Sequence, residues 1–293
     1  MGSETESAAH PIWSTSAVEL IHRFDVPMAA RGPATYQRDF VQRYAPNQSQ
    51  LMPREVAEEL YRAGSRSQAR SAGDWSDRTL VEPLVDLSWN SSRLEGNRYS
   101  YHAAAELLNG GALRCDVDTV MLLNHKAALE FLVHDVSQEG LSAVVLRNVH
   151  AILMQDLVAD SSSLGAIRQG PLGIAGTLYS PTQEPDVIEA MLESIVDKAD
   201  RIENPVEAAL FLWIQLAYLQ PFEHGNAATS RLAANIPLLL RNCAPLTFQD
   251  VTREHYARAM LAVYELRDAT LAADLLSWSY QRSMAKCAAA RDA

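Results

Sequence analysis

The residues best suited to chemistry lie together in one short segment, residues 220–231. Gly225 and Asn226 form a turn between two stretches of helical sequence, so the first N–H groups of the second helix should point outward at this turn. Such a helix start attracts anions, because its unpaired N–H groups and the positive end of the helix dipole favour negative charge. We therefore predict that the turn at Gly225 and Asn226 binds an anion such as a phosphate or a carboxylate.

His224 brings a second kind of chemistry to this segment, since an imidazole changes its charge near neutral pH and can act as a base, an acid or a ligand. A plainer interpretation uses the same residues. Gly225 would only supply a turn, Asn226 would cap the next helix, and His224 would pack or face water. Taken alone, the local pattern favours this plainer interpretation.

A buried helix is expected to present the turn. Residues 206–219 are apolar on nearly every side, which is typical of a helix buried on most faces. Pro205 suits the first turn of that helix, where a missing N–H group costs little. After the break at Pro221, the helical pattern resumes near Asn226 and continues to Leu240.

Helical patterns cover most of the remaining chain. Further helices are expected at residues 54–61, 77–91, 100–108, 116–133, 140–157 and 185–199, with two more between 252 and 286. The first 12 residues are predicted to be a tail, and residues 26–47 show weak periodicity. The alternating run 172–179, bounded by Gly and Pro residues, predicts a short β-hairpin.

Residues 220–231 resemble the motif of the Fic family, His-Pro-Phe-x-Asp/Glu-Gly-Asn-Gly-Arg-x-x-Arg. The matching positions are Pro221, Phe222, Gly225, Asn226 and Arg231. The resemblance continues upstream at Gly165 and Arg168 and downstream through Tyr256. It implies a mostly α fold, with a Fic-type helical core, one short β-hairpin flap and an N-terminal helical extension.

Domain boundaries and a partner also follow from the resemblance. The Fic-like domain would span residues 81–280, between a tail and helical extension at 1–80 and a C-terminal tail at 281–293. In relatives the hairpin docks a target segment by strand addition, so residues 172–179 are expected to bind a protein segment. The oligomeric state is left open, with a homodimer among the options.

Residues 91–97 resemble the inhibitory helix of some Fic proteins, Ser/Thr-x-x-x-Glu-Gly/Asn. There the Glu pairs with the last Arg of the motif and blocks productive placement of the ATP γ-phosphate. The equivalent residues here are Glu95 and Arg231. The alternative is that Glu95 is a surface residue before a helix stop at Gly96.

Several positions of the motif depart from the family pattern. Gln220 replaces the His that acts as general base, and an amide cannot accept a proton near neutral pH. His224 replaces the acidic residue that helps to hold Mg²⁺, a cation that prefers oxygen ligands. Ala227 and Ala228 replace Gly-Arg and remove a cation from the phosphate site. These changes argue against Mg-ATP binding and against standard AMP transfer.

Three functions are compatible with these residues. The first is a divergent Fic-fold enzyme that uses Gln220 and His224 on a small anionic substrate held by Gly225, Asn226 and Arg231. The second is an inactive binding or regulatory protein that retains the fold, the Glu95–Arg231 contact and a small anionic ligand or nucleotide. The third, which two missing supports for phosphoryl chemistry make the weakest, is residual AMP transfer.

Composition excludes other classes of function. The formal net charge of −11 would repel a nucleic acid backbone, and no apolar run is long enough to suggest a membrane partner. The 3 cysteines are widely spaced, which favours a reducing cytoplasm over a disulfide framework. No metal site is predicted, because the spacings of His125, His134 and His150 do not form a ligand pair.

Overall fold

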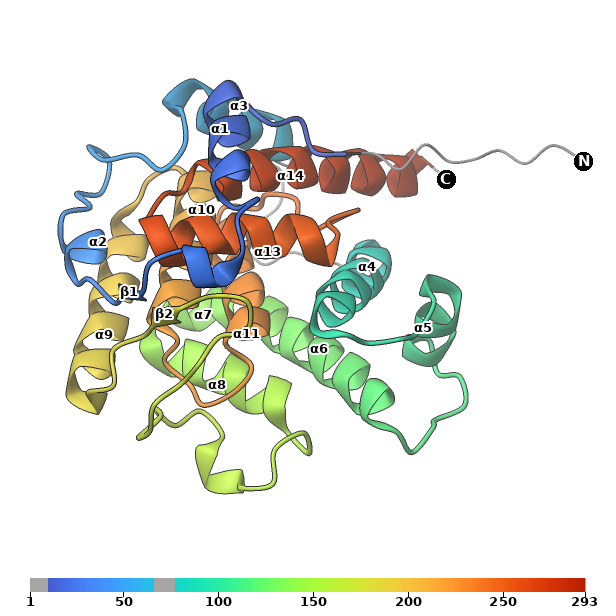
Figure 1. Ribbon diagram of the computed structural model, residues 1–293. Coiled ribbons are helices and arrows are strands. Elements are labelled where there is room, and N and C mark those ends of the chain that lie inside the picture. Colours follow the sequence, from blue (N-terminus) through green and yellow to red (C-terminus); the bar gives the residue numbers. More distant parts are fainter. Residues whose placement is uncertain (1–9, 66–76, 293) are drawn as a thin grey trace, which may run out of the picture.

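The computed structural model of the chain describes residues 10–65 and 77–292, and nearly all of its regular structure is helical (Figure 1). The helices are α1 (Thr15–Arg23), α2 (Asp39–Gln42), α3 (Arg54–Gly64), α4 (Asp77–Glu95), α5 (Tyr101–Leu108), α6 (Val117–His134), α7 (Val136–Glu139), α8 (Ala143–Met154), α9 (Pro185–Arg201), α10 (Pro205–Leu219), α11 (Asn226–Ala233), α12 (Asn235–Leu240), α13 (Arg253–Leu261) and α14 (Thr270–Asp292). Two short 3₁₀ turns, at Met28–Ala30 and Ser161–Ser163, and one π turn, at Ala262–Leu266, complete the helical elements.

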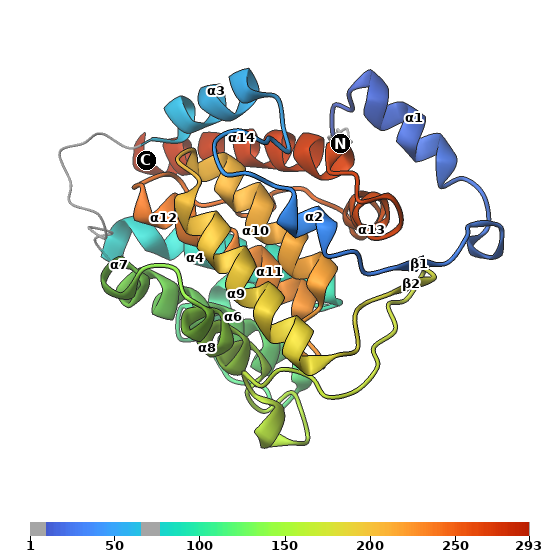
Figure 2. The same ribbon diagram turned by 90° about the vertical axis from the view of Figure 1, so that its left-hand side faces the viewer.

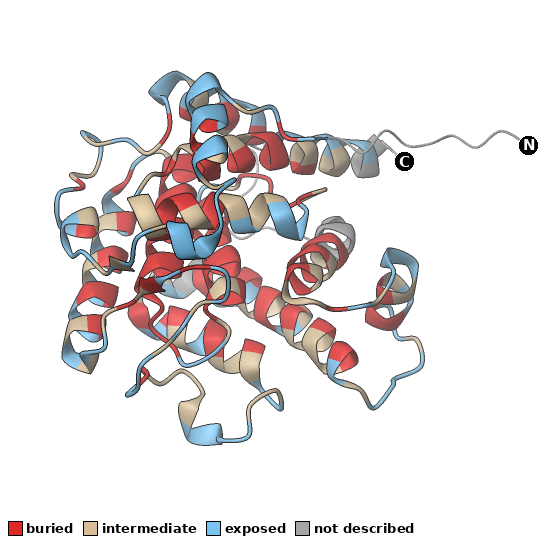
Figure 3. Ribbon diagram, in the orientation of Figure 1, coloured by how far each residue is buried: buried red, intermediate tan, exposed pale blue. Residues whose placement is uncertain are grey.

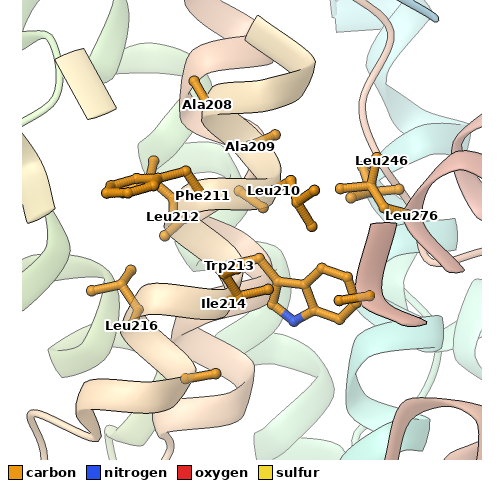
Figure 4. Close-up of a cluster of buried hydrophobic side chains, with 14 of the residues drawn as sticks. Ala208, Ala209, Leu210, Phe211, Leu212, Trp213, Ile214, Leu216, Leu246 and Leu276 are labelled. Carbon is orange, nitrogen blue, oxygen red and sulfur yellow. The ribbon is translucent and has the colours of Figure 1, made fainter. Parts of the chain in front are cut away.

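Helix α10 is the centre of the molecule, as its sequence predicts. Asn204 caps its first turn by accepting hydrogen bonds from the N–H groups of Val206 and Glu207, and Pro205 occupies the first helical position. Every residue of α10 is buried, and the helix packs against α3, α9, α11, α12 and α14. In Figure 4, Trp213 projects toward Leu246 and Leu276 while Phe211 projects from the opposite side. The continuous apolar sequence of α10 is therefore explained by neighbours all round it.

Helices α4, α6 and α8 form a second group beside this centre. Helix α6 packs against both α4 and α8, and α11 contacts α4 and α8 (Figure 1). Figure 3 shows the buried residues of these helices on the sides that face one another. Helix α11 thus lies between α8 and α4, so residues far apart in sequence meet around the predicted turn and the helix that follows it.

The single helix expected from Asn226 to Leu240 is two helices, α11 and α12. Pro237 explains the break, because its ring clashes with the carbonyl four residues earlier, at Ala233, and it has no N–H to donate to that carbonyl. Helix α11 ends at Ala233. The helix predicted to end at Ser91 continues to Glu95, where Gly96 stops it with a φ of +105°.

The β-hairpin expected at residues 172–179 is absent. Residues 170–178 form a flap loop with a turn at Ala175 and Gly176, and only Tyr179–Ser180 form a strand, β2. Its partner is β1, Ala34–Thr35, in parallel orientation. Figure 2 shows the two strands side by side at one edge of the molecule. The alternating pattern therefore did not predict this segment correctly, because most of it is a loop and its short strand pairs with the N-terminal region.

The N-terminal region contains a helix that the sequence did not reveal. Helix α1 begins after Ser14, whose side chain accepts a hydrogen bond from the N–H of Ala17. It packs against α14, and the N–H of Ser14 donates to Asp274 at 2.8 Å. Among the described residues, no helix has both the length and the apolar character needed to cross a membrane.

Candidate functional site

Gln220 occupies the corner between α10 and the turn. Its backbone is left-handed, with φ +53°, and its side chain is 6% exposed. The amide Nε2 donates to the carbonyl of Ala217 at 2.6 Å and lies 3.4 Å from the hydroxyl of Tyr264. The amide is therefore turned back onto its own helix.

Asn226 closes the turn from inside. Its Oδ1 accepts from the N–H of Phe222 at 2.9 Å, and its Nδ2 donates to the carbonyl of Phe222 at 2.8 Å. It is the first residue of α11, and Gly225 holds the capping position with φ +67°. A Cβ atom at Gly225 would lie 2.7 Å from Sδ of Met154, the flexible end of a side chain that can shift, so the positive φ is the main reason for a glycine at this position.

Arg168 joins the flap loop to the turn. Its Nε donates to the carbonyl of Gln220 at 2.7 Å, and its Nη1 donates to the carbonyl of Gly170 at 2.8 Å. Its Nη2 donates to the carbonyl of Thr182, and its own N–H bonds the carbonyl of Pro221 at 3.1 Å. Burial lowers the pKa of Arg168. The guanidinium thus holds backbone in place and leaves little for a ligand.

His150 supports the turn from α8, a role that sequence reasoning missed. Its ring stacks on Phe222 with centroids 3.9 Å apart. Its Nδ1 accepts from the N–H of Gly165 at 2.9 Å, so the proton is on Nε2, which donates to the carbonyl of His224 at 3.1 Å. Burial lowers the pKa of His150 to about 4. The imidazole is therefore neutral at pH 7 and fixes the backbone of the turn.

The side chain of His224 differs from its predicted companions, because it is exposed. Only the carbonyl of His224 is tied down, by His150. The imidazole lies just before the start of α11 and is open to solvent, and this is the position that the resemblance assigns to a metal-binding acid.

Arg231 is completely buried and is held by α4. Its Nε donates to Oγ of Ser91 at 3.1 Å, and its Nη2 donates to the carbonyl of Ser91 at 3.1 Å and to Oε1 of Glu95. Its guanidinium also lies 4.9 Å from the centroid of the Tyr256 ring. Burial alone would lower the pKa of Arg231, but the nearby Glu95 carboxylate raises it above its usual value. The contact expected between Glu95 and Arg231 is present.

A directed set of hydrogen bonds continues from Arg231 to α6. Nδ1 of His125 donates to the carbonyl of Met121 at 2.8 Å, which leaves Nε2 as an acceptor for the hydroxyl of Ser91 at 3.2 Å. Ser91 therefore accepts from Arg231 and donates to His125. Burial lowers the pKa of His125 to about 4. These bonds fix the position of α4 against the buried cation.

Two tyrosines contact the polar groups of this site. Tyr264 approaches the Gln220 amide, and Tyr256 lies beneath the Arg231 guanidinium. Burial raises the pKa of Tyr264, and the charge of Glu95 contributes to the same shift. The two residues predicted to share catalysis differ in exposure, because the Gln220 amide is buried and bonded to its own helix whereas His224 is exposed.

The residues present do not fit a Mg²⁺-bound triphosphate. Where the family has an acidic ligand, the chain has His224, whose nitrogen atoms are poor ligands for a hard cation. Ala228 is 1% exposed and offers no charge, and Arg231 already bonds Ser91 and Glu95. Within the described part of the chain, no group of three or more His, Cys, Asp and Glu side chains could hold a metal ion.

A cavity of about 350 Å³ lies beside the turn and the flap loop. Its lining includes the carboxylates of Asp160 and Glu223. Arg168 also lines it, but its donors are bonded to backbone carbonyls. The cavity is therefore acidic, which disfavours an anion.

Comparisons with known proteins identify the fold. Residues 140–238 match the Fic/DOC family, and no curated protein matches the chain by sequence. A Fic-domain signalling protein from Bacteroides thetaiotaomicron has a similar structure, with 22% identity, a TM-score of 0.65, and coverage of 81% of this chain and 98% of that chain. Fic-1 from C. elegans is also similar, with 20% identity, a TM-score of 0.62, and coverage of 80% of this chain and 69% of that chain. The domain IbpAFic2, solved in complex with adenylylated Cdc42, has 13% identity and a TM-score of 0.51, with coverage of 91% of this chain and 76% of that chain. The chain therefore has a Fic-type fold.

Proposed function

We propose that this Fic-fold chain is a binding or regulatory protein that does not transfer AMP by the mechanism of its relatives. One observation carries the proposal: the buried polar groups at Gln220, Asn226 and Arg231 are bonded within the protein, apart from Nη1 of Arg231, which is buried without a partner among the described residues. The Gln220 amide bonds Ala217, the Asn226 amide bonds Phe222, and the Arg231 guanidinium bonds Ser91 and Glu95. A transferase would need at least the base and the cation to face its substrate.

Regulation through α4 is part of this proposal. Glu95 is 29% exposed in its side chain whereas Arg231 is 0% exposed, so the carboxylate lies between the buried cation and solvent. Moving Glu95 away would leave the Arg231 charge unpaired. That charge would then favour an anionic ligand, such as a nucleotide or a carboxylate metabolite, in the place of the Glu95 carboxylate.

The divergent enzyme acting on a small anionic substrate is the second candidate, and the exposure of His224 favours it. A solvent-accessible imidazole at a helix start could act as an acid or a base. The bonding of the Gln220 amide to its own helix and the acidic lining of the neighbouring cavity count against it. We therefore place it below the binding protein, reversing the order that the sequence alone favoured.

A protein segment is a further proposed partner, at residues 172–179 of the flap loop. The solved complex of IbpAFic2 with adenylylated Cdc42 is one Fic domain with a protein bound. In this chain the backbone around Gly173 and Gly176 has open space where side chains would stand, so it is accessible. We also propose a cytoplasmic location, on the basis of the cysteine content.

Ligand-detected NMR tests the binding function. The full chain and its Glu95→Gly variant would be screened with ATP, ADP, AMP and small carboxylates, with and without Mg²⁺. We expect the variant to bind an anionic ligand more tightly than the unaltered chain, without a requirement for Mg²⁺. Equal affinities for both proteins would remove Glu95 from any regulatory role, and turnover of a small anion that is lost in His224→Ala would favour the enzyme.

A further inference from the structure

A cavity of about 210 Å³ lies away from the turn, where α3 and the loop before it meet the start of α10. Its lining includes Tyr44, Met52, Ala57, Tyr61, Ile202, Asn204 and Glu207. None of these residues belongs to the turn at residues 220–226 or to the Glu95–Arg231 contact. A cavity of about 150 Å³ is enough to hold benzene, so a small organic molecule would fit here.

Glu207 is the unusual residue of this cavity, because it is a carboxylate that is 5% exposed. Its Oε1 accepts from the hydroxyl of Tyr44 at 2.9 Å and from the N–H of Leu51 at 2.7 Å. Its Oε2 is buried and has no hydrogen-bond partner among the described residues. Burial raises the pKa of Glu207. The N–H groups of Leu51 and Met52 and the hydroxyl of Tyr44 lower the pKa, but burial has the larger effect. The N–H of Met52 thus acts on the carboxylate from nearby, but Oε2 has no direct hydrogen bond of the kind that a buried charge needs.

The charges that line the cavity favour a cation, and not an anion, as the ligand that supplies the missing donor. The N–H groups of Val206 and Glu207, which could have bound an anion at this helix start, both donate to Oδ1 of Asn204, at 2.9 and 3.2 Å. Glu203 adds a second carboxylate at the exposed rim.

Two cations near the cavity are already bonded, and one of them, Arg54, lines the cavity together with its partner Glu58. Arg54 donates to Glu58 at 2.9 Å, and Lys198 donates to the carbonyl of Tyr44 at 2.6 Å. The excess charge in the cavity is therefore negative, and an incoming cation would be attracted to it.

The rest of the lining suits a short hydrocarbon chain. Met52 and Ile202 are buried apolar residues, and the rings of Tyr44 and Tyr61 also attract cations. We propose that this cavity binds a small primary ammonium compound, whose ammonium group donates to Glu207 and whose alkyl chain packs against Met52 and Ile202. Nothing in this proposal depends on the chemistry of the turn.

The probe is n-butylammonium, titrated into the full chain and followed by NMR shifts of the Asn204 amide and of the tyrosine rings. Saturable binding is expected, with 1-butanol, which has nearly the same shape but no charge, binding about tenfold more weakly or worse. Glu207→Gln should weaken n-butylammonium binding by a similar factor. The matched control is Glu203→Gln at the exposed rim, where screening by water should limit the effect to about threefold.

A second variant keeps the test decisive if Glu207→Gln does not fold. Ala57 is 4% exposed and lines the cavity, so Ala57→Met fills the cavity while leaving the carboxylate in place. This variant should abolish n-butylammonium binding. The proposal is overturned by equal binding of n-butylammonium and 1-butanol, by unchanged binding in a folded Glu207→Gln protein, or by unchanged binding in Ala57→Met.

Discussion

At the scale of single residues, the turn has the backbone that the resemblance implies but differs from the family pattern in several side chains. Gln220 cannot take a proton, and its amide is used to terminate α10. Gly225 and Asn226, by contrast, still provide the conformation and hydrogen bonds that close the turn. The residues that shape the turn are thus retained, while those that the resemblance links to AMP transfer are replaced.

Gly225 gives a residue-level prediction of stability. Gly225→Ala should lower the free energy of unfolding by about 1–3 kcal/mol, because alanine is strained at this positive φ and its Cβ would meet Met154. Urea unfolding measures the change. Gly173→Ala is the matched control, since nothing lies within 4 Å of the added Cβ and no positive φ is required there. An equal change in both variants would show that the turn does not need glycine.

The sequence could not predict the residues that support the site from other elements. Ser91, on α4, bonds Arg231 across 140 residues of sequence. His150, on α8, bonds the turn at His224 across 74 residues. Neither has a spacing that signals such a contact, since Ser and His occur on many helix surfaces. Only the family resemblance pointed to Glu95, because a Glu before a Gly helix stop is by itself an ordinary surface pattern.

At the scale of elements, patterns within one segment were more informative than pairings between segments. The apolar sequence of α10 and the signals at Pro205 and Pro221 predicted that helix, because local physics determines them. The partner of β2 was not predictable, since alternation indicates an extended backbone but does not say which strand will pair with it.

The pairing of β1 with β2 gives an element-level prediction. Arg31 holds the two segments together, because its Nη2 donates to the carbonyl of Gly176 at 2.8 Å and its Nη1 lies 3.3 Å from Glu265. In Arg31→Ala, the N–H of Tyr36, which bonds Ser180 at 3.1 Å, should exchange with deuterium about tenfold faster or more. The control is Arg43→Ala, whose side chain is 82% exposed. Unchanged exchange at Tyr36 would show that Arg31 does not secure the strand pair.

At the scale of the whole molecule, the two buried histidines predict how stability depends on pH. Burial lowers the pKa of both His125 and His150 from 6.5 to about 4, so the folded protein binds fewer protons than the unfolded chain between these values. Their contribution to the free energy of unfolding is fully present above pH 6.5 and is lost as the pH falls toward 4. Across this pH range, each histidine changes the free energy of unfolding by up to roughly 3 kcal/mol.

Urea unfolding at pH 7.5, 6 and 5 measures this dependence. The free energy of unfolding should fall across the series, and His150→Gln should reduce the slope because the variant has one fewer buried group to titrate. His22→Gln, at an exposed position in the same protein, is the control and should leave the slope unchanged. A flat profile, or an equal slope in His150→Gln and the unaltered chain, would contradict a buried neutral imidazole at His150.

The most direct test of the proposed function is intact-mass spectrometry after incubation with Mg-ATP and candidate protein targets. Three proteins are compared: the unaltered chain, Glu95→Gly, and Glu95→Gly with the family residues restored by Gln220→His, His224→Asp, Ala227→Gly and Ala228→Arg. Circular dichroism first establishes that each is folded. We predict that AMP becomes attached to protein only with the restored variant. Attachment by Glu95→Gly alone would show that the unaltered turn transfers AMP once α4 no longer closes it, and would contradict the account.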